Sequence, residues 1–141
     1  LYNRRFFESE MGRLDNSRLL PISIIMSDID GLKKINDQFG HAKGDEYIKV
    51  VAEEIKEAVR KEDILARVGG DEFAILLPKT NEKEVQKIEQ RIQSNVNQLN
   101  DKYDYPVGIS TGYGVKKNSD TKLEDVFKKA DYYMYKMKNN C

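Results

Sequence analysis

The stretch "RVGGDEFAILLP", residues 67–78, places two glycines and two carboxylates between two apolar runs. Apolar residues alternate in the run before the glycines, "DILARV" (63–68), and follow one another in the run after them, "FAILLP" (73–78). A Gly-Gly pair between two such runs is typical of a tight β-hairpin turn. We therefore predict two antiparallel strands, with Asp71 and Glu72 at the tip as either a polar turn or part of an active site.

The rest of the chain contains further helical and strand-like apolar patterns. They predict a helix from the start to about residue 16, a buried strand at 22–30, a short helical segment at 31–40, a long helix from Ala42, a helix over 85–96, a strand at 107–115 and a last helix over 123–137. Without the first and last helices the order is β-α-β-β-α-β, which predicts an α+β fold of the ferredoxin-like type with a mostly antiparallel sheet flanked by helices. The tight hairpin disfavours a doubly wound parallel sheet, because it makes two neighbouring strands antiparallel.

Length and composition set limits on the class of protein. At 141 residues the chain is predicted to form a single domain. Its 24 basic and 24 acidic residues give a formal net charge of +0, so no nucleic-acid partner is indicated. No apolar stretch approaches the roughly 18 residues of a membrane span. The only cysteine, Cys141, rules out an internal disulfide and indicates a cytoplasmic protein. Zinc-type Cys/His spacing, a P-loop motif and a serine-nucleophile signature do not occur.

Two acidic groups that are distant in sequence are predicted to meet in the fold. In a ferredoxin-like sheet the strand at 22–30 is antiparallel to the strand that follows the hairpin, so Asp28 and Asp71 come to the same end of the sheet. Converging carboxylates suit Mg²⁺, which prefers oxygen ligands. Taken alone, "DID" (28–30) would more often be a solvated strand end. The convergence with the hairpin acids favours a metal site.

Basic and amide side chains follow the first acidic group along the chain. Lys33 is suitably placed to neutralise phosphate charge near a metal ion, whereas Lys34 is more typical of a solvated face. Asn36 and Asp45 together suit a purine, because an amide both donates and accepts while a carboxylate accepts from two donors of guanine. Each of them alone would more often end or cap a helix. His41, the only histidine, is interpreted on its own as a packing or turn residue.

Several of these stretches together resemble one known family. "GGDEF" (69–73), preceded by "DIDGLKKINDQFGHAKGD" (28–45), resembles the GGDEF family of diguanylate cyclases. The opening "NRR" (3–5) and the closing "ADYYMYKMK" (130–138) are similar to that family too. The resemblance therefore extends over essentially the whole chain, and its two long motifs stand at the expected separation.

The resemblance implies a palm-like catalytic core that joins two GTP molecules into cyclic di-GMP and releases two pyrophosphates. It implies two Mg²⁺ (or Mn²⁺) ions per half-site, bound by Asp28, the backbone carbonyl of Ile29, Asp71 and Glu72. A 3′-hydroxyl attacks the α-phosphorus in line, with Asp71 as the proton acceptor. Because each half-site holds one GTP, catalysis needs a homodimer.

The substrate contacts implied in the same way fall into three groups. They are the phosphate contacts Lys33 and Lys138, the guanine readers Asn36 and Asp45 with His41 at a matching motif position, and the backbone of Gly69 and Gly70, where side chains would obstruct the nucleotide. In this family an upstream sensory or receiver segment usually controls the pairing of half-sites. We therefore expect an excised catalytic domain whose regulatory domain is absent, and whose full-length form can be membrane-anchored.

The stretch "RKED", residues 60–63, has two interpretations. As a charged helix terminus, its basic residues would complement the helix dipole. Arg60 and Asp63 also match, at five residues before Gly69, the family's R-x-x-D site at which the product inhibits the enzyme. Arg91 on the following helix is expected to add a basic contact for cyclic di-GMP.

Two other functions compete with a diguanylate cyclase. One is an inactive module that binds GTP or cyclic di-GMP as a regulatory receptor, which normally has a broken signature motif, whereas the motif here is intact. The other is a different palm-type nucleotidyl cyclase or polymerase, which would share the metal-binding acids but not the guanine readers.

Overall fold

We describe the protein from a computed structural model, which covers residues 1–103 and 106–139, so that Cys141 lies outside the described residues. Its elements are β1 (Tyr2–Asn3), α1 (Arg4–Asp15), β2 (Ile22–Asp30), α2 (Leu32–Phe39), α3 (His41–Ala58), β3 (Ile64–Arg67), β4 (Glu72–Leu77), α4 (Glu82–Asn97), the 3₁₀ helix η1 (Gln98–Asp101), β5 (Gly108–Lys116) and α5 (Leu123–Asn139). All the predicted elements are present. Within the described ranges, no helix is long and apolar enough to cross a membrane.

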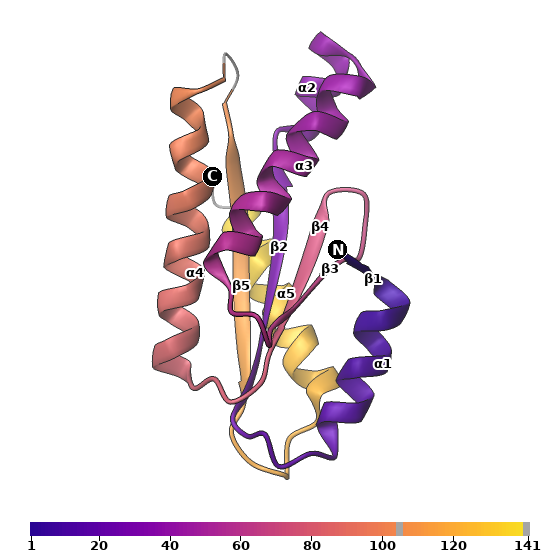
Figure 1. Ribbon diagram of the computed structural model, residues 1–141, viewed down its shortest axis with the longest axis vertical. Coiled ribbons are helices and arrows are strands. Elements are labelled where there is room, and N and C mark those ends of the chain that lie inside the picture. Colours follow the sequence, from indigo (N-terminus) through magenta and orange to yellow (C-terminus); the bar gives the residue numbers. More distant parts are fainter. Residues whose placement is uncertain (104–105, 140–141) are drawn as a thin grey trace.

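The strands form one sheet in the order β1-β3-β4-β2-β5 (Figure 1). The central strand β2 is antiparallel to both β4 and β5, and β3 and β4 are joined as the predicted hairpin. The predicted α+β, ferredoxin-like fold is therefore confirmed. The strand β1 was not predicted: its two residues pair in parallel with the hairpin strand β3 at the edge of the sheet.

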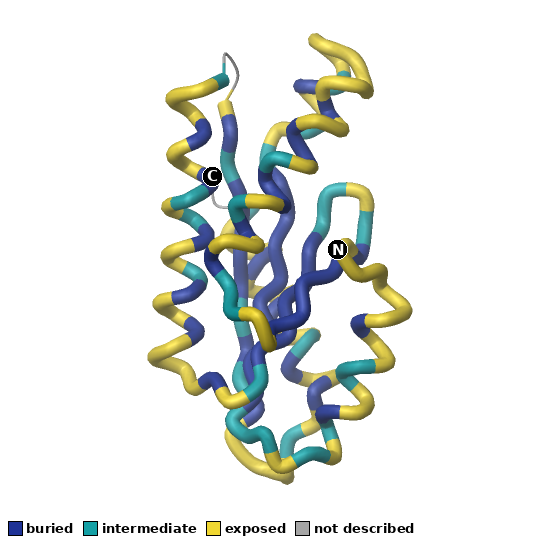
Figure 2. Tube along the Cα trace, in the orientation of Figure 1, coloured by how far each residue is buried: buried dark blue, intermediate teal, exposed yellow. Residues whose placement is uncertain are grey.

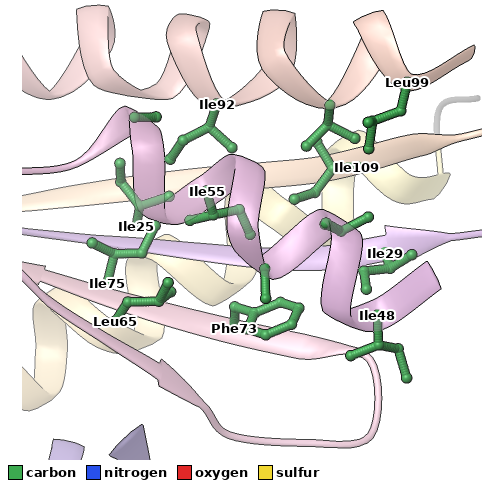
Figure 3. Packing of buried hydrophobic residues seen from close by; sticks show 14 of the residues in the cluster. Ile25, Ile29, Ile48, Ile55, Leu65, Phe73, Ile75, Ile92, Leu99 and Ile109 are labelled. Carbon is green, nitrogen blue, oxygen red and sulfur yellow. The ribbon is translucent and has the colours of Figure 1, made fainter. Parts of the chain in front are cut away.

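Helices cover both faces of this sheet, so its central strand is buried on each side (Figure 2). On one face α3 and α4 pack over a cluster that includes Ile25, Ile55 and Ile92 (Figure 3). On the other face α1 and α5 cover a second cluster, to which β2 contributes Ile24 and Met26. Because alternate residues of a strand point to opposite faces, the continuous apolar run of β2 supplies both cores. Truncating one such isoleucine to alanine costs about 2–5 kcal/mol.

Local signals fix where the helices begin and end. Asn81 caps α4, since its side chain accepts a hydrogen bond from the Glu84 N–H at 2.8 Å while the Glu84 carboxylate accepts one from the Asn81 N–H at 3.0 Å. Gly31 and Gly40 flank α2 with φ of 76° and 89°, a conformation that glycine adopts without strain. The chain therefore turns sharply after the acids of β2, and again between α2 and α3.

The helix α5 lies directly on β5 because that strand contains glycines. A Cβ at Gly112 would meet the backbone of α5, including the Tyr133 carbonyl carbon at 2.7 Å. A Cβ at Gly114 would lie 2.7 Å from the Val126 carbonyl oxygen. No larger residue fits at either position without moving the helix. This close packing fixes the path of α5 along the sheet.

Candidate active site

A cleft of about 880 Å³ lies where β2 ends, and several elements contribute to its wall. The residues that line it come from the end of β2, from α2, from the hairpin, from the segment before β5 and from the end of α5: Ile29, Asp30, Gly31, Leu32, Lys33, Lys34, Ile35, Gln38, Asp71, Pro106, Val107, Gly108 and Lys138. Four residues predicted to bind metal or phosphate are among them, namely Ile29, Lys33, Asp71 and Lys138.

The predicted meeting of Asp28 and Asp71 at one end of the sheet is confirmed. Asp28 pairs with Glu72 in the β2–β4 register, and the next residue, Ile29, donates its N–H to the Asp71 carbonyl oxygen at 2.9 Å. Antiparallel pairing thus brings acids that are some forty positions apart in sequence to adjacent places in the fold.

The carboxylate of Asp28 is buried and incompletely satisfied. Its Oδ1 atom accepts no well-aligned hydrogen bond from the described residues, and its close cationic neighbour is Lys138 Nζ at 2.8 Å. Burial raises the pKa of Asp28 to about 6; the Lys138 ammonium opposes that shift and the nearby Asp71 carboxylate adds to it. Burial by itself would lower the pKa of Lys138, but its contact with Asp28 outweighs this effect and raises it.

These oxygens fit a hard divalent cation that also binds substrate. Within residues 1–103 and 106–139, no group of three or more His, Cys, Asp or Glu side chains could hold a metal ion by itself. Asp28 and Asp71 with a backbone carbonyl would leave coordination positions for phosphate oxygens, as Mg²⁺ requires. The buried Asp28 oxygen, now facing an ammonium group, is a place where a cation is favourable.

The Glu72 side chain, unlike that of Asp28, is turned toward the hairpin glycines. It folds back over the hairpin, where its Oε1 atom lies against Gly69 so closely that a Cβ there would collide with it. Gly70, by contrast, is exposed, and a Cβ there would meet no atom within 4 Å. Open space thus lies beside the second glycine, and the first one accommodates Glu72.

The predicted guanine readers lie at the junction of α2 and α3. The Asn36 side chain lies against Gly44, and a Cβ at that glycine would collide with the Asn36 Oδ1 atom. Asp45 follows Gly44 on α3 and is exposed, so both predicted readers border the same junction. His41 is the exposed first residue of α3.

The predicted inhibitory site lies at the opposite end of β3 from the hairpin acids (Figure 1). Arg60 donates to Asp63 from Nε at 3.2 Å and from Nη2 at 3.0 Å, and it also bonds the Pro78 carbonyl oxygen at 3.0 Å and the Thr80 hydroxyl. The exposed Arg91 donates to the carbonyl oxygen of Ala58 at 3.0 Å, which places it near the same end of α3.

Sequence reasoning missed three polar residues that hold this cleft in shape. Arg67 closes the hairpin turn by donating from Nη2 to the Gly70 carbonyl oxygen at 2.6 Å. Asp30 lines the cleft and accepts a hydrogen bond from Ser110 Oγ at 2.9 Å. Tyr47 is buried on α3 and reaches the end of the sheet. The position of Arg67 beside the glycines was an available signal, whereas the partner of Tyr47 is 17 residues away and no local pattern indicates it.

Comparison with known proteins places this arrangement in a family. The sequence profile described as "Diguanylate cyclase, GGDEF domain" matches residues 1–141. The probable diguanylate cyclase DgcT of Escherichia coli is 34% identical over 144 residues, which cover 98% of this chain and 32% of that protein. The chain thus spans about a third of the length of that curated relative.

Solved structures agree in fold over nearly the whole chain. The GGDEF domain of DgcB from Caulobacter crescentus, in complex with c-di-GMP, superposes with a TM-score of 0.90 at 27% identity, covering 99% of this chain and 86% of that one. The active GGEEF domain of a diguanylate cyclase from Vibrio cholerae gives 0.86 at 29% identity, covering 99% and 92%. The chain described here therefore belongs to the GGDEF domain family of diguanylate cyclases.

Proposed function

We propose that this chain is a catalytic domain that condenses two GTP molecules into cyclic di-GMP and releases two pyrophosphates. The observation that carries this proposal is the convergence of Asp28, Asp71, Lys33 and Lys138 at one end of the sheet. Acids that suit a divalent cation and lysines that suit phosphates therefore border the same cleft. Family membership and the intact "GGDEF" motif support the same function.

In this proposal the cleft holds the triphosphate and the reacting oxygens. Asp28, Asp71 and the Ile29 carbonyl would hold Mg²⁺ or Mn²⁺, and Glu72 would join them once its side chain leaves Gly69. The ion, when bound, neutralises negative charge on the phosphates. Asp71 accepts the proton of the attacking 3′-hydroxyl. Lys33 lies on the cleft wall and stabilises phosphate charge. Lys138 contacts the Asp28 carboxylate, and it would turn to the triphosphate when a metal ion binds that carboxylate instead.

Guanine would be read at the junction of α2 and α3. The Asp45 carboxylate accepts from the N1–H and the exocyclic amine, and the Asn36 amide both donates and accepts. The exposed His41 lies at the start of the same helix. The open space beside Gly70 would let the nucleotide approach the backbone, and Gly69 would offer the same access once the Glu72 side chain moves away.

Each chain offers one such cleft, so two GTP molecules would react across a homodimer of facing half-sites. Product would bind a second site made of Arg60, Asp63 and Arg91, and would inhibit the reaction there. The similar GGDEF domain of DgcB was solved in complex with c-di-GMP, which supports product binding in this family. The bidentate geometry of arginine suits both the guanine edge and the phosphate of that product.

Product analysis tests the proposal. The purified protein is incubated separately with GTP and with ATP in the presence of Mg²⁺. The products are then separated and identified by mass spectrometry. We expect cyclic di-GMP from GTP and no cyclic dinucleotide from ATP. Binding of GTP without turnover would indicate a regulatory receptor instead, and equal use of ATP would indicate a different palm-type enzyme.

A further inference from the structure

The hydroxyl of Tyr47 joins α3 to the last residue pair of β2 and β5. Tyr47 is only 1% exposed. Its oxygen lies 3.0 Å from the Asp30 carbonyl oxygen and 3.4 Å from that of Gly108, and it accepts a hydrogen bond from the Gly108 N–H at 3.1 Å. Asp30 and Gly108 are the final partners in the β2–β5 register. A hydroxyl has one proton, so it donates to the nearer carbonyl, that of Asp30, and accepts from Gly108.

Packing alone does not require this hydroxyl. Tyr47 lies within the apolar cluster under α3, where a phenylalanine ring would fill the same volume. A buried hydroxyl is unfavourable unless it is hydrogen-bonded, and here it is bonded to the ends of two strands. Its function is therefore to connect those strand ends to the helix.

The connection links the two halves of the proposed active site. On one side, Asp30 comes directly after Ile29 and two residues after Asp28, the proposed metal ligands. On the other side, Tyr47 stands two residues after Asp45, the proposed guanine reader, on the same helix. The hydroxyl therefore connects the segment that would bind metal to the helix that would bind the base.

The β5 side of this junction has a separate support. Asn100 donates from Nδ2 to the Val107 carbonyl oxygen at 2.9 Å, and its Oδ1 accepts from the Val107 N–H at 2.7 Å. Removing the Tyr47 hydroxyl would cost the Gly108 N–H one hydrogen bond, but Val107 beside it would stay bonded to Asn100. The end of β2 would lose a contact to α3, so the effect should concentrate on the metal-binding segment.

We propose that Tyr47 is a positioning residue that fixes the distance between the metal-binding end of β2 and the guanine-reading end of α3. The proposal rests on the function proposed above. It assigns Tyr47 no contact with substrate. Its hydroxyl acts through the Asp30 backbone, and so sets where the Ile29 carbonyl and the Asp28 carboxylate lie relative to the base.

The test compares Tyr47→Phe with Tyr113→Phe. Tyr113, on β5, has a hydroxyl that accepts a hydrogen bond from Gln86 Nε2 at 2.7 Å, so the control loses one hydroxyl contact on the same sheet outside the cleft lining. Mn²⁺ affinity of the metal-stripped protein is measured by calorimetry with a saturating non-hydrolysable GTP analogue that supplies the phosphate oxygens, and GTP affinity is measured in EDTA. For Tyr47→Phe we expect Mn²⁺ binding to weaken by about three- to tenfold, the size of one lost hydrogen bond, with GTP affinity in EDTA unchanged. Tyr113→Phe should change neither value.

Hydrogen exchange provides a second measurement that does not depend on activity. In Tyr47→Phe the amides of residues 29–31 and 108 should exchange faster, while those around Tyr113 keep their rates. Unchanged Mn²⁺ affinity, or equal weakening of Mn²⁺ and GTP binding, would overturn the proposal. Failure of Tyr47→Phe to fold would also overturn it, since the hydroxyl would then serve the fold and not the spacing. If the unmodified protein makes no cyclic di-GMP, the proposed function fails, yet the Mn²⁺ comparison still tests Tyr47.

Discussion

The acids of the cleft and the turn at residues 60–63 both pair a carboxylate with a cation, but the two pairs differ in what else surrounds them. In the cleft, Asp28 Oδ1 has Lys138 as its close cation and lacks a well-aligned hydrogen bond from the described residues. In the turn, Asp63 accepts from the Arg60 N–H at 2.7 Å as well as from its guanidinium, which in turn bonds the Pro78 carbonyl.

This difference determines which charges are available to a ligand. Burial raises the pKa of Asp28, so its charged form is unfavourable until a cation compensates it. Hydrogen bonding to Asp63 raises the pKa of Arg60, so that pair is already stable without a ligand. A ligand gains more by binding at the cleft, whereas at the turn it must share donors that the fold already uses.

The largest effect should come from removing the proposed base. Asp71→Asn should lower cyclic di-GMP synthesis by at least about 10²–10⁴-fold, the range for loss of a general base. The melting temperature should hardly change, because Asp71 is a half-buried residue of the hairpin tip, outside both apolar clusters. Rates and melting curves are compared with those of Glu72→Gln, whose side chain packs on Gly69 and should retain more activity. Near-normal synthesis by Asp71→Asn would contradict the assignment.

The pH dependence of stability should distinguish the unsatisfied acid from the satisfied one. The pKa of Asp28 is about 6 in the folded protein against a reference of 3.8, so between these values the folded state binds more protons than the unfolded state. The free energy of unfolding attributable to Asp28 therefore falls as pH rises through this window, by about 2 kcal/mol between pH 4.5 and pH 7. Asp28→Asn should lack this loss. Urea unfolding in EDTA at pH 4.5 and pH 7 measures it, and parallel pH profiles for both proteins would argue against the shift.

Arg60→Ala should affect both stability and product binding. The Asp63 side chain is 0% exposed, so without its arginine a buried carboxylate loses its charged partner, at a cost of about 1–3 kcal/mol. Cyclic di-GMP affinity should fall while the uninhibited rate is kept. Calorimetry with the product and thermal unfolding measure the two effects.

Arg91→Ala is the matched variant, since Arg91 bonds the Ala58 carbonyl and not a buried carboxylate, so its stability loss should be smaller. Unchanged product affinity in Arg60→Ala would leave this turn with a structural function alone.

The last variant should change base preference and have little effect on stability. Asp45→Ala should weaken GTP binding more than ATP binding, because two guanine donors lose their acceptor, at a cost of about 1–3 kcal/mol. Asp45 is exposed and should contribute little to folding. Competition binding with both nucleotides gives the ratio. If both weaken equally, Asp45 does not read guanine.

The order of elements and the meeting of the acids could be predicted because they depend on periodicity and pairing rules. The apolar run of β2 and the Gly-Gly turn determine the antiparallel pairing that brings Asp28 beside the hairpin. The strand β1 could not be predicted, since two residues carry no periodicity. It exists because the chain entering α1 lies along β3.

Side-chain partners across long separations could not be predicted either. Arg60 bonds Pro78, 18 residues away, and no local pattern gives that contact. Lys138 was expected to contact phosphate, and its contact with Asp28 depends on where α5 lies on the sheet. The contact of Tyr47 with Asp30 and Gly108 likewise requires the three-dimensional arrangement of α3 and two strand ends.

The glycines of β5 hold α5 at one point along its length, so the position of its C-terminal end depends on the tilt of the helix at that point. The helix is in contact with Gly112 at Ala130 and Met134, and Lys138 lies eight residues beyond Ala130, roughly 12 Å along the axis. A tilt of about 10° at that contact would move the Lys138 backbone by roughly 2 Å relative to Asp28. Glycine at positions 112 and 114 thus determines where Lys138 lies beside the cleft, although neither glycine lines it.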